Sequence, residues 1–166
     1  MLRIWFNRTY ATNAHVIRML RENPDRRAIR VIGTHTDPDS PVLAACDEVA
    51  AEPLPDGTTP GGAGANTDRG PSPATRLHAD AYVRWALEFA RTRHVDVFVP
   101  RAHMAELADA RAQFAAVGTR LVCADGDVVR LFADKALAYQ AAAKLGLPVP
   151  PYRVVRDSAG LRAAHE

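Results

Sequence analysis

An acid–lysine pair near the end of the chain carries the residues best suited to chemistry. Asp134 and Lys135 open a helical apolar stripe, and Gly146 and Pro148 end it, so the pattern predicts a capped helix. The first turn of a helix has unpaired N–H groups and a partial positive charge that favour anions. We therefore predict that Lys135 binds a phosphate. The alternative is that Asp134 only caps the helix and that Lys135 is solvated.

A second group of polar residues follows the predicted strands. In open α/β sheets, ligands bind beyond the carboxyl ends of the strands, so polar residues at those ends are candidates for a substrate site. Polar residues are also the ordinary content of surface loops, and this background explanation stays open for each of them. The candidates on the substrate side are Asn7, Thr9, Thr34, His35, Asp37, Arg101 and His103.

Several familiar catalytic patterns are absent from the sequence. A dinucleotide site needs a glycine-rich turn after the first strand, and the turn 7–12 has no glycine. Asp37 follows the second strand, where a ribose-binding acid would lie. Because those glycines are missing, we interpret Asp37 as a turn residue. The sequence has no phosphate-binding GxxxxGK[ST] loop, no HExxH, no GxSxG and no metal-spaced Cys/His cluster. We therefore predict no catalytic residue and no metal ligand within these 166 residues.

The elements that position these residues alternate between strand and helix. Apolar runs predict strands at 2–6, 29–33, 48–50, 95–99 and 121–123. Helical stripes lie at 16–20, 42–46, 82–90 and 104–115, and Gly118 suits the position just after the last of these. Such alternation predicts an α/β fold, a Rossmann-like and mostly parallel sheet with helices on both faces.

The last part of the chain follows a different order. A short helix is expected at 128–132, followed by the helix that Asp134 caps. A last strand is predicted at 152–155, and Ser158 with its neighbours opens one more helix that has little room to finish. We expect a first domain over 1–124 and the start of a second over 125–166, and we expect the chain to be a fragment.

Residues 53–73 interrupt the alternation. This stretch holds five of the ten glycines and has almost no apolar side chain. A segment with so little to bury cannot offset the entropy of ordering, so we predict a flexible loop; a lid over the site is the alternative.

Composition excludes several classes of protein. The 21 basic and 19 acidic residues leave a net charge of +2, which gives no electrostatic case for a nucleic-acid partner. No apolar run is long enough for a membrane span, and the first residues do not form a signal peptide, so we predict a cytoplasmic protein with no membrane partner. Cys46 and Cys123 are expected to be buried thiols.

The order of these features resembles a known superfamily. The segment from Ala133 to Pro150 resembles the opening of the ATP-grasp nucleotide-binding lobe, in enzymes such as biotin carboxylase and D-alanine–D-alanine ligase. The acidic stretch at 45–48 and the strand at 94–100 resemble parts of the pre-ATP-grasp domain that precedes that lobe. The resemblance spans residues 2–155. The turn at 7–12 departs from it, because relatives often carry glycine there.

The resemblance implies an activity for the complete protein. ATP-grasp ligases use ATP and Mg²⁺ to convert a carboxylate into an acyl phosphate, which a nucleophile then attacks. In relatives, the residue that matches Lys135 contacts the ATP phosphates. We thus expect the N-terminal portion of an ATP-dependent carboxylate ligase that forms C–N or C–S bonds, inactive alone and with no cofactor tightly bound.

The expected partner is a small-molecule carboxylate, and a homodimer is left open. Two other functions also stay open at this point. One is a fragment of a dinucleotide-binding oxidoreductase, and the other is a non-catalytic domain that binds a partner protein.

Overall fold

The computed structural model describes residues 1–53 and 73–165, which form two compact units, Met1–Gly126 and Asp127–Glu166. The loop predicted at 53–73 lies outside the described residues except at its two ends. That the second unit opens a nucleotide-binding lobe, with a domain boundary after residue 124, stays a prediction. No helix among the described residues is long and apolar enough to span a bilayer.

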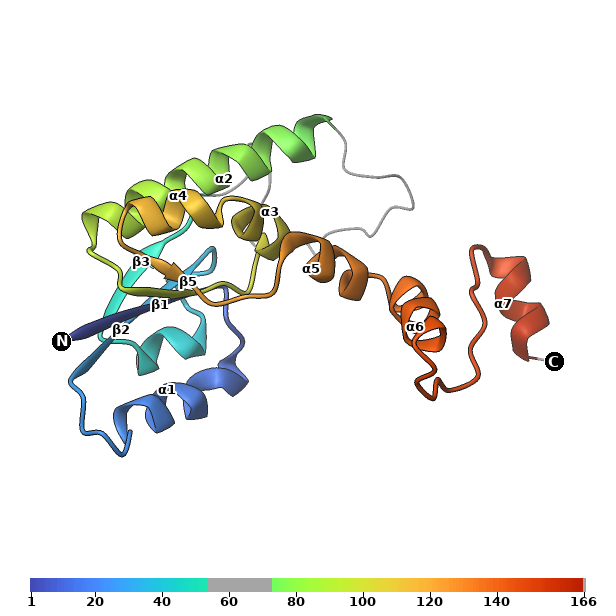
Figure 1. The fold of residues 1–166 in the computed structure, drawn as a ribbon, viewed down its shortest axis with the longest axis horizontal. Helices are drawn as coiled ribbons and strands as arrows, with labels where there is room; N and C mark the ends of the chain where they lie inside the picture. Colours follow the sequence, from blue (N-terminus) through green and yellow to red (C-terminus); the bar gives the residue numbers. More distant parts are fainter. Residues whose placement is uncertain (54–72, 166) are drawn as a thin grey trace. The chain divides into compact units, whose positions relative to one another are not determined.

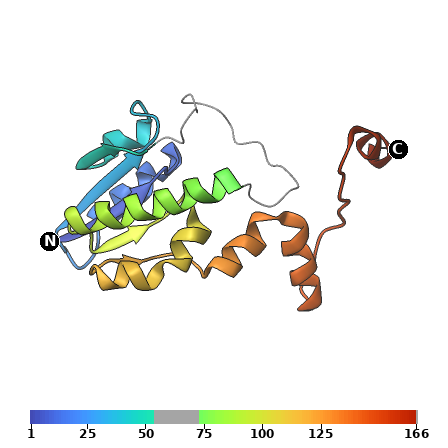
Figure 2. The ribbon, with the colours of Figure 1, turned by 90° about the horizontal axis from the view of Figure 1, so that it is seen from above.

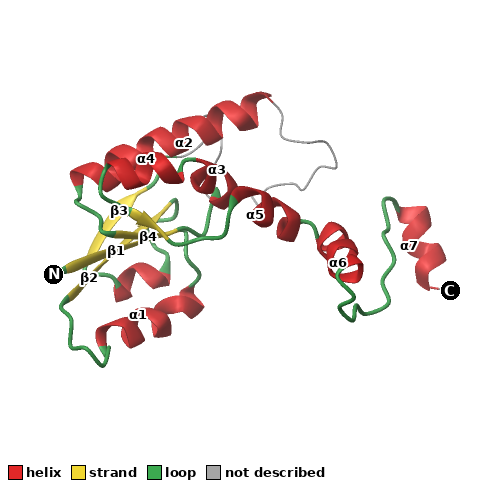
Figure 3. Cartoon of the chain, in the orientation of Figure 1, coloured by secondary structure: helices red, strands yellow, loops and turns green. Residues whose placement is uncertain are grey.

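A five-stranded parallel sheet forms the centre of the first unit (Figure 3). Its strands are β1 (Leu2–Asn7), β2 (Ile29–His35), β3 (Glu48–Ala51), β4 (Val97–Val99) and β5 (Arg120–Leu121), in the order β3-β2-β1-β4-β5. All four pairings are parallel, so the chain must cross a face of the sheet between one strand and the next. This arrangement confirms the predicted Rossmann-like fold.

The central strand β1 is apolar on both sides because each face of the sheet packs against helices. Alternate residues of a strand point to opposite faces. Ile4 and Phe6 therefore enter one core with Ile17 of helix α1 (Ala14–Arg21). Trp5 enters the other, where its ring stacks on that of Phe98 with centroids 3.7 Å apart.

Helices cover both faces of the sheet (Figure 1), as predicted. The 3₁₀ turns η1 (Ala11–Asn13) and η2 (Pro41–Ala45) flank α1 on one face. On the other face, α2 (Pro73–Thr92) lies beside α4 (Arg111–Ala116) (Figure 2). Gly118 has a φ of +82° just after α4, which confirms the predicted helix end.

The single helix predicted over 104–115 is wrong, because two helices occupy that stretch. α3 (Met104–Asp109) ends and α4 begins at Ala110, whose ψ of 9° leaves the helical region. Leu107 and Phe114 are seven residues apart and enter the same core, so their spacing also fits one uninterrupted helix and does not reveal the break.

The strand predicted at 152–155 is also wrong. The second unit contains only the helices α5 (Gly126–Ala133), α6 (Lys135–Lys144) and α7 (Ser158–His165) among its described residues. Residues 152–155 have strand propensity, but a strand needs a hydrogen-bonded neighbour, and the described part of this unit supplies none. Gly146, with φ of +72°, ends α6 as predicted.

Candidate functional site

Buried polar side chains gather where β1, β2, β3 and β4 end, which we call the carboxyl edge. Asn7 ends β1, Thr34 lies beside it in β2, and Glu52 directly follows β3. The strand order reverses next to β1, because β2 and β3 extend the sheet on one side and β4 and β5 on the other. Ligands of open α/β sheets bind at such a reversal, so the carboxyl edge is the candidate site.

Glu52 is the centre of a hydrogen-bond network at this edge. Its carboxylate, with a fully buried side chain, accepts hydrogen bonds from Arg8 Nε at 2.6 Å and from the Thr34 hydroxyl at 2.7 Å. The Tyr82 hydroxyl donates a third at 3.1 Å. Burial, and next the Glu52 charge, raise the pKa of Tyr82 far above its usual range, so this hydroxyl stays protonated. Both carboxylate oxygens are thus occupied.

Asn7 joins β1 to the loop after β4. Its amide nitrogen donates to the Tyr82 hydroxyl at 2.7 Å and to the carbonyl of Ala102 at 3.2 Å. Its oxygen accepts from the backbone N–H of Arg101 at 2.6 Å and of Ala102 at 3.3 Å. With both ends of the amide used in this way, Asn7 fixes the shape of the edge instead of facing a ligand.

Three nitrogens around Tyr82 have no hydrogen-bond partner in the described part of the chain. They are Arg8 Nη2, His78 Nε2 and His103 Nε2, and all three atoms are buried. The His103 ring lies 4.2 Å from the Tyr82 ring and 5.5 Å from that of His78, between centroids, and Arg8 Cζ lies 5.4 Å from the Tyr82 centroid. An unpaired buried polar group costs about 1–3 kcal/mol, and more when it is charged.

His103 is neutral in this setting. Burial, followed by the charges of Arg8 and His78, lowers its pKa from 6.5 to about 4. Its backbone is left-handed, with φ of 52°, immediately before α3. The His103 ring is thus uncharged, and it contacts the rings of Tyr82 and His78 on α2.

The other predicted substrate-side residues lie around this network and make local contacts. The Thr9 hydroxyl accepts from the Asn13 amide at 2.5 Å, at the start of α1. His35 Nδ1 accepts from the backbone N–H of Asp37, which confines that pair to a turn. The Arg101 guanidinium lies 6.0 Å from the Tyr10 ring centroid. Of the seven candidates, Asn7, Thr34 and His103 are the ones that Tyr82 and Glu52 bring together.

Sequence reasoning missed Arg8, Glu52, His78 and Tyr82. A charged residue directly after a strand was the available signal for Arg8 and Glu52. His78 and Tyr82 are four residues apart on α2, which places them on one face of that helix. Tyr82 lies in the helical stripe predicted at 82–90, which indicates an apolar helix face and gives no sign of where the hydroxyl points.

Lys135 is the first residue of α6, in the second unit, and its side chain is exposed. Asp134 caps this helix as predicted, accepting from the N–H groups of Ala136 at 2.8 Å and Leu137 at 3.1 Å. The cap occupies two of the N–H groups that a phosphate would otherwise use. The exposed Lys135 ammonium is therefore the main attraction for an anion here, and its role stays a prediction.

No group of three or more His, Cys, Asp or Glu residues in the described ranges could hold a metal ion. Whether a residue of this chain contributes a ligand to the expected Mg²⁺ stays a prediction, because one or two carboxylates and the ATP phosphates can hold this ion.

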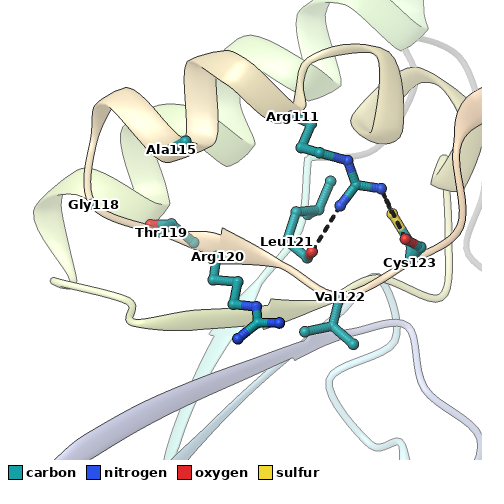
Figure 4. Close-up of a pocket in the computed structure, with 8 residues that line it drawn as sticks. All are labelled: Arg111, Ala115, Gly118, Thr119, Arg120, Leu121, Val122 and Cys123. Atoms are coloured by element: carbon teal, nitrogen blue, oxygen red, sulfur yellow. Dashed lines mark hydrogen bonds between the residues drawn. The ribbon is translucent and has the colours of Figure 1, made fainter.

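An open groove of about 720 Å³ runs along β5, the edge strand of the sheet (Figure 4). Arg111 spans it, donating to the carbonyls of Leu121 at 2.9 Å and Cys123 at 2.8 Å. The hydroxyl of Thr119 donates to the carbonyl of Val95. Because these polar side chains already have backbone partners, the groove is a weaker candidate than the carboxyl edge.

Neither a scan of protein-family models nor a search of curated proteins finds a match. Solved structures do resemble the chain. The biotin carboxylase domain of a single-chain bacterial carboxylase matches 99% of this chain and 34% of its own, with 21% identity and a TM-score of 0.52. A single-chain long-chain acyl-CoA carboxylase matches 99% of this chain and 14% of its own, with 21% identity and a TM-score of 0.53.

The biotin carboxylase subunit of pyruvate carboxylase matches 98% of this chain and 32% of its own, with 18% identity and a TM-score of 0.51. The chain has the fold of part of a biotin carboxylase domain. It spans about a third or less of the length of these structures. The likeness agrees with the predicted pre-ATP-grasp fold, and at such identity it concerns the fold alone.

Proposed function

We propose that this chain is the N-terminal portion of an ATP-dependent carboxylate ligase of the ATP-grasp type. The observation that carries the proposal is the match of almost the whole chain, across both units, to biotin carboxylase domains. A Rossmann-like unit followed by a capped helix with a first-turn lysine is the order that the sequence resemblance also predicts. The chain's share of those structures leaves room for the remaining machinery in the complete protein.

The surface of the second unit supports a longer protein. Phe132, Leu145 and Leu161 are among its large apolar side chains that stay exposed, at 69%, 77% and 63%. No residue of α6 is buried. A unit of this size that leaves its apolar side chains in water lacks a core of its own, so we propose that further sequence packs on it.

In the complete protein, ATP would supply the phosphoryl group that turns the carboxylate into an acyl phosphate, ready for attack by a nucleophile. Lys135 would hold the ATP phosphates through its ammonium group. The first unit would hold the carboxylate substrate at its carboxyl edge. We place the metal ligands in the remaining part of the complete protein, so the 166-residue chain alone should be inactive.

A dinucleotide-binding oxidoreductase is the alternative, and the local structure gives it little support. The turn after β1 begins with Arg8, which has φ of 41° and bonds to Glu52, so a side chain stands where a pyrophosphate needs glycine. Calorimetric titration with NAD(P) would detect that function. A non-catalytic domain for a partner protein would instead reveal itself by stable co-purification.

Two measurements test the proposed function. Lys135→Ala in the complete protein should weaken ATP binding about ten- to a hundredfold, because a charge-assisted hydrogen bond contributes roughly 1.5–3 kcal/mol. Lys144→Ala, at the other end of α6, is the matched control and should not change nucleotide affinity. Equal ATP affinities of the two variants would show that Lys135 is a solvated surface residue.

The second measurement uses the 166-residue chain itself. It should release phosphate from Mg-ATP at no more than the background rate, because phosphoryl transfer needs metal ions and several positioned donors. Sustained turnover that a substitution in this chain abolishes would contradict the proposal and indicate an enzyme complete in itself.

A further inference from the structure

The carboxyl edge has more hydrogen-bond donors than acceptors. Both oxygens of Glu52 accept hydrogen bonds, and the oxygen of Asn7 accepts two. The Tyr82 hydroxyl accepts from Asn7 and donates to Glu52. After these bonds are formed, Nη2 of Arg8 is a donor that lacks an acceptor in the described part of the chain.

The imidazoles of His78 and His103 can add further hydrogen-bond donors to this edge. Neutral histidine carries one N–H, which can lie on Nε2, and Nε2 of both His78 and His103 has no partner among the described residues. The rings lie edge to face, 5.5 Å apart between centroids. A group that carries only acceptors would satisfy all three nitrogens, and an oxyanion is such a group.

The charges at the edge allow an anion to bind. Glu52 balances the charge of Arg8 through Nε and leaves Nη2 available. His78 and Tyr82 come from α2, His103 precedes α3, and Arg8 follows β1, so three segments meet around the Tyr82 ring. Burial, followed by the charge of Arg8, keeps the pKa of His103 low, and an anion placed beside it would raise that pKa again.

The backbone at the edge is held in an uncommon conformation. Arg8 and His103 both have positive φ, at 41° and 52°, and they are two of the four non-glycine residues with this geometry in the described ranges. Such residues persist only where surrounding contacts fix them, and they cluster at ligand sites.

We propose that Arg8, His78 and His103 form a binding site for one oxyanion group, a carboxylate or a phosphate, at the carboxyl edge. Each residue is partly exposed although its nitrogen is shielded, so rotation of the side chains brings the three N–H groups to a ligand. Only the identification of this group with the carboxylate of the ligase substrate rests on the proposed function. Anion binding itself does not depend on it.

The test is a titration of the 166-residue chain, followed through the imidazole nitrogens of His78 and His103 by NMR. Sodium acetate and sodium phosphate are added in separate arms at an ionic strength held constant with sodium chloride. We expect saturable shifts at both Nε2 atoms in at least one arm, and the tighter arm identifies the ligand as carboxylate or phosphate. Linear shifts that match the chloride reference in both arms would overturn the proposal.

Substitutions of Arg8 and His78 test whether these residues bind the anion. Arg8→Lys keeps a cation beside Glu52 but removes the second donor nitrogen, and His78→Gln removes an imidazole that has no hydrogen-bond partner to lose in the described structure. Each should weaken anion binding at least tenfold. Arg91→Lys, on the exposed end of α2, is the matched control and should bind as the parent chain does.

Two results would contradict this assignment. One is unchanged anion affinity in His78→Gln with the fold intact by circular dichroism. The other is tight Zn²⁺ binding through both histidines without any anion binding, which would identify the pair as metal ligands. Neither result bears on Lys135, so failure here and failure of the ligase proposal are distinguishable.

Discussion

Glu52 and Asp134 are two acidic residues at the ends of secondary-structure elements, and their surroundings differ completely. Glu52 is buried, and its partners come from the turn after β1, from β2 and from α2, as far as 44 residues away along the chain. Asp134 is exposed and accepts hydrogen bonds from residues two and three positions ahead. A carboxylate of the first kind holds segments together, whereas one of the second kind stabilises a single helix end.

The largest effect should follow removal of the buried carboxylate. Glu52→Ala leaves the Arg8 charge and two hydroxyls without their acceptor, which should lower the free energy of unfolding of the first unit by about 3–5 kcal/mol. Urea denaturation measures this loss. Glu88→Ala, which removes an exposed carboxylate from α2, should leave the denaturation midpoint unchanged. Equal midpoints for the two variants would show that the buried network contributes little.

A smaller loss of stability should depend on pH, because His103 titrates differently in the folded and unfolded chain. The folded pKa of His103, at about 4, lies below its unfolded value of 6.5, so the unfolded chain binds the proton more readily. The resulting instability is absent above pH 6.5 and grows as pH falls towards 4, reaching about 1–3 kcal/mol after allowance for partial exposure.

The variant His103→Asn isolates this contribution. Asparagine tolerates the left-handed backbone and does not titrate. The stability difference between parent and variant should therefore change between pH 6.5 and 4 and stay constant above that range. Parallel curves over the whole range would mean that His103 titrates normally.

The smallest loss of stability should follow removal of the Asp134 carboxylate. Asp134→Ala removes the cap of α6 and should cost about 1 kcal/mol in that helix alone. Amide exchange within α6 should accelerate, while exchange in the first unit stays the same. If protection fell equally in both units, the comparison between local and long-range carboxylates would fail.

The same contrast explains which features the sequence could predict. The Asp134 cap and the glycines that end helices depend on neighbours along the chain, and the structure confirms them. The five strands predicted in the first unit are confirmed as well, because each has a strand to pair with. Glu52 and His78 owe their surroundings to distant segments, and no local pattern identifies such contacts. The wrong strand at 152–155 has the same cause, because strand propensity is local whereas pairing requires a second strand.

At the carboxyl edge, the general rule for open sheets predicted the region but not the residues that converge. Asn7, Thr34 and His103 are among the predicted substrate-side residues, whereas the network that joins them runs through Tyr82 and Glu52. A tyrosine on an apolar helix face reads as core, because the sequence does not reveal where its hydroxyl will point.

The positions of the aromatic side chains have a consequence for spectroscopy. The protein has two tryptophans: Trp5 is buried in the core of the first unit, and the partly buried Trp85 packs against it with ring centroids 5.8 Å apart. Intrinsic tryptophan fluorescence excited at long wavelength should therefore follow the unfolding of the first unit. Far-ultraviolet ellipticity, in contrast, includes the three helices near the end of the chain. Transitions that differ between the two signals would show that the two units unfold separately.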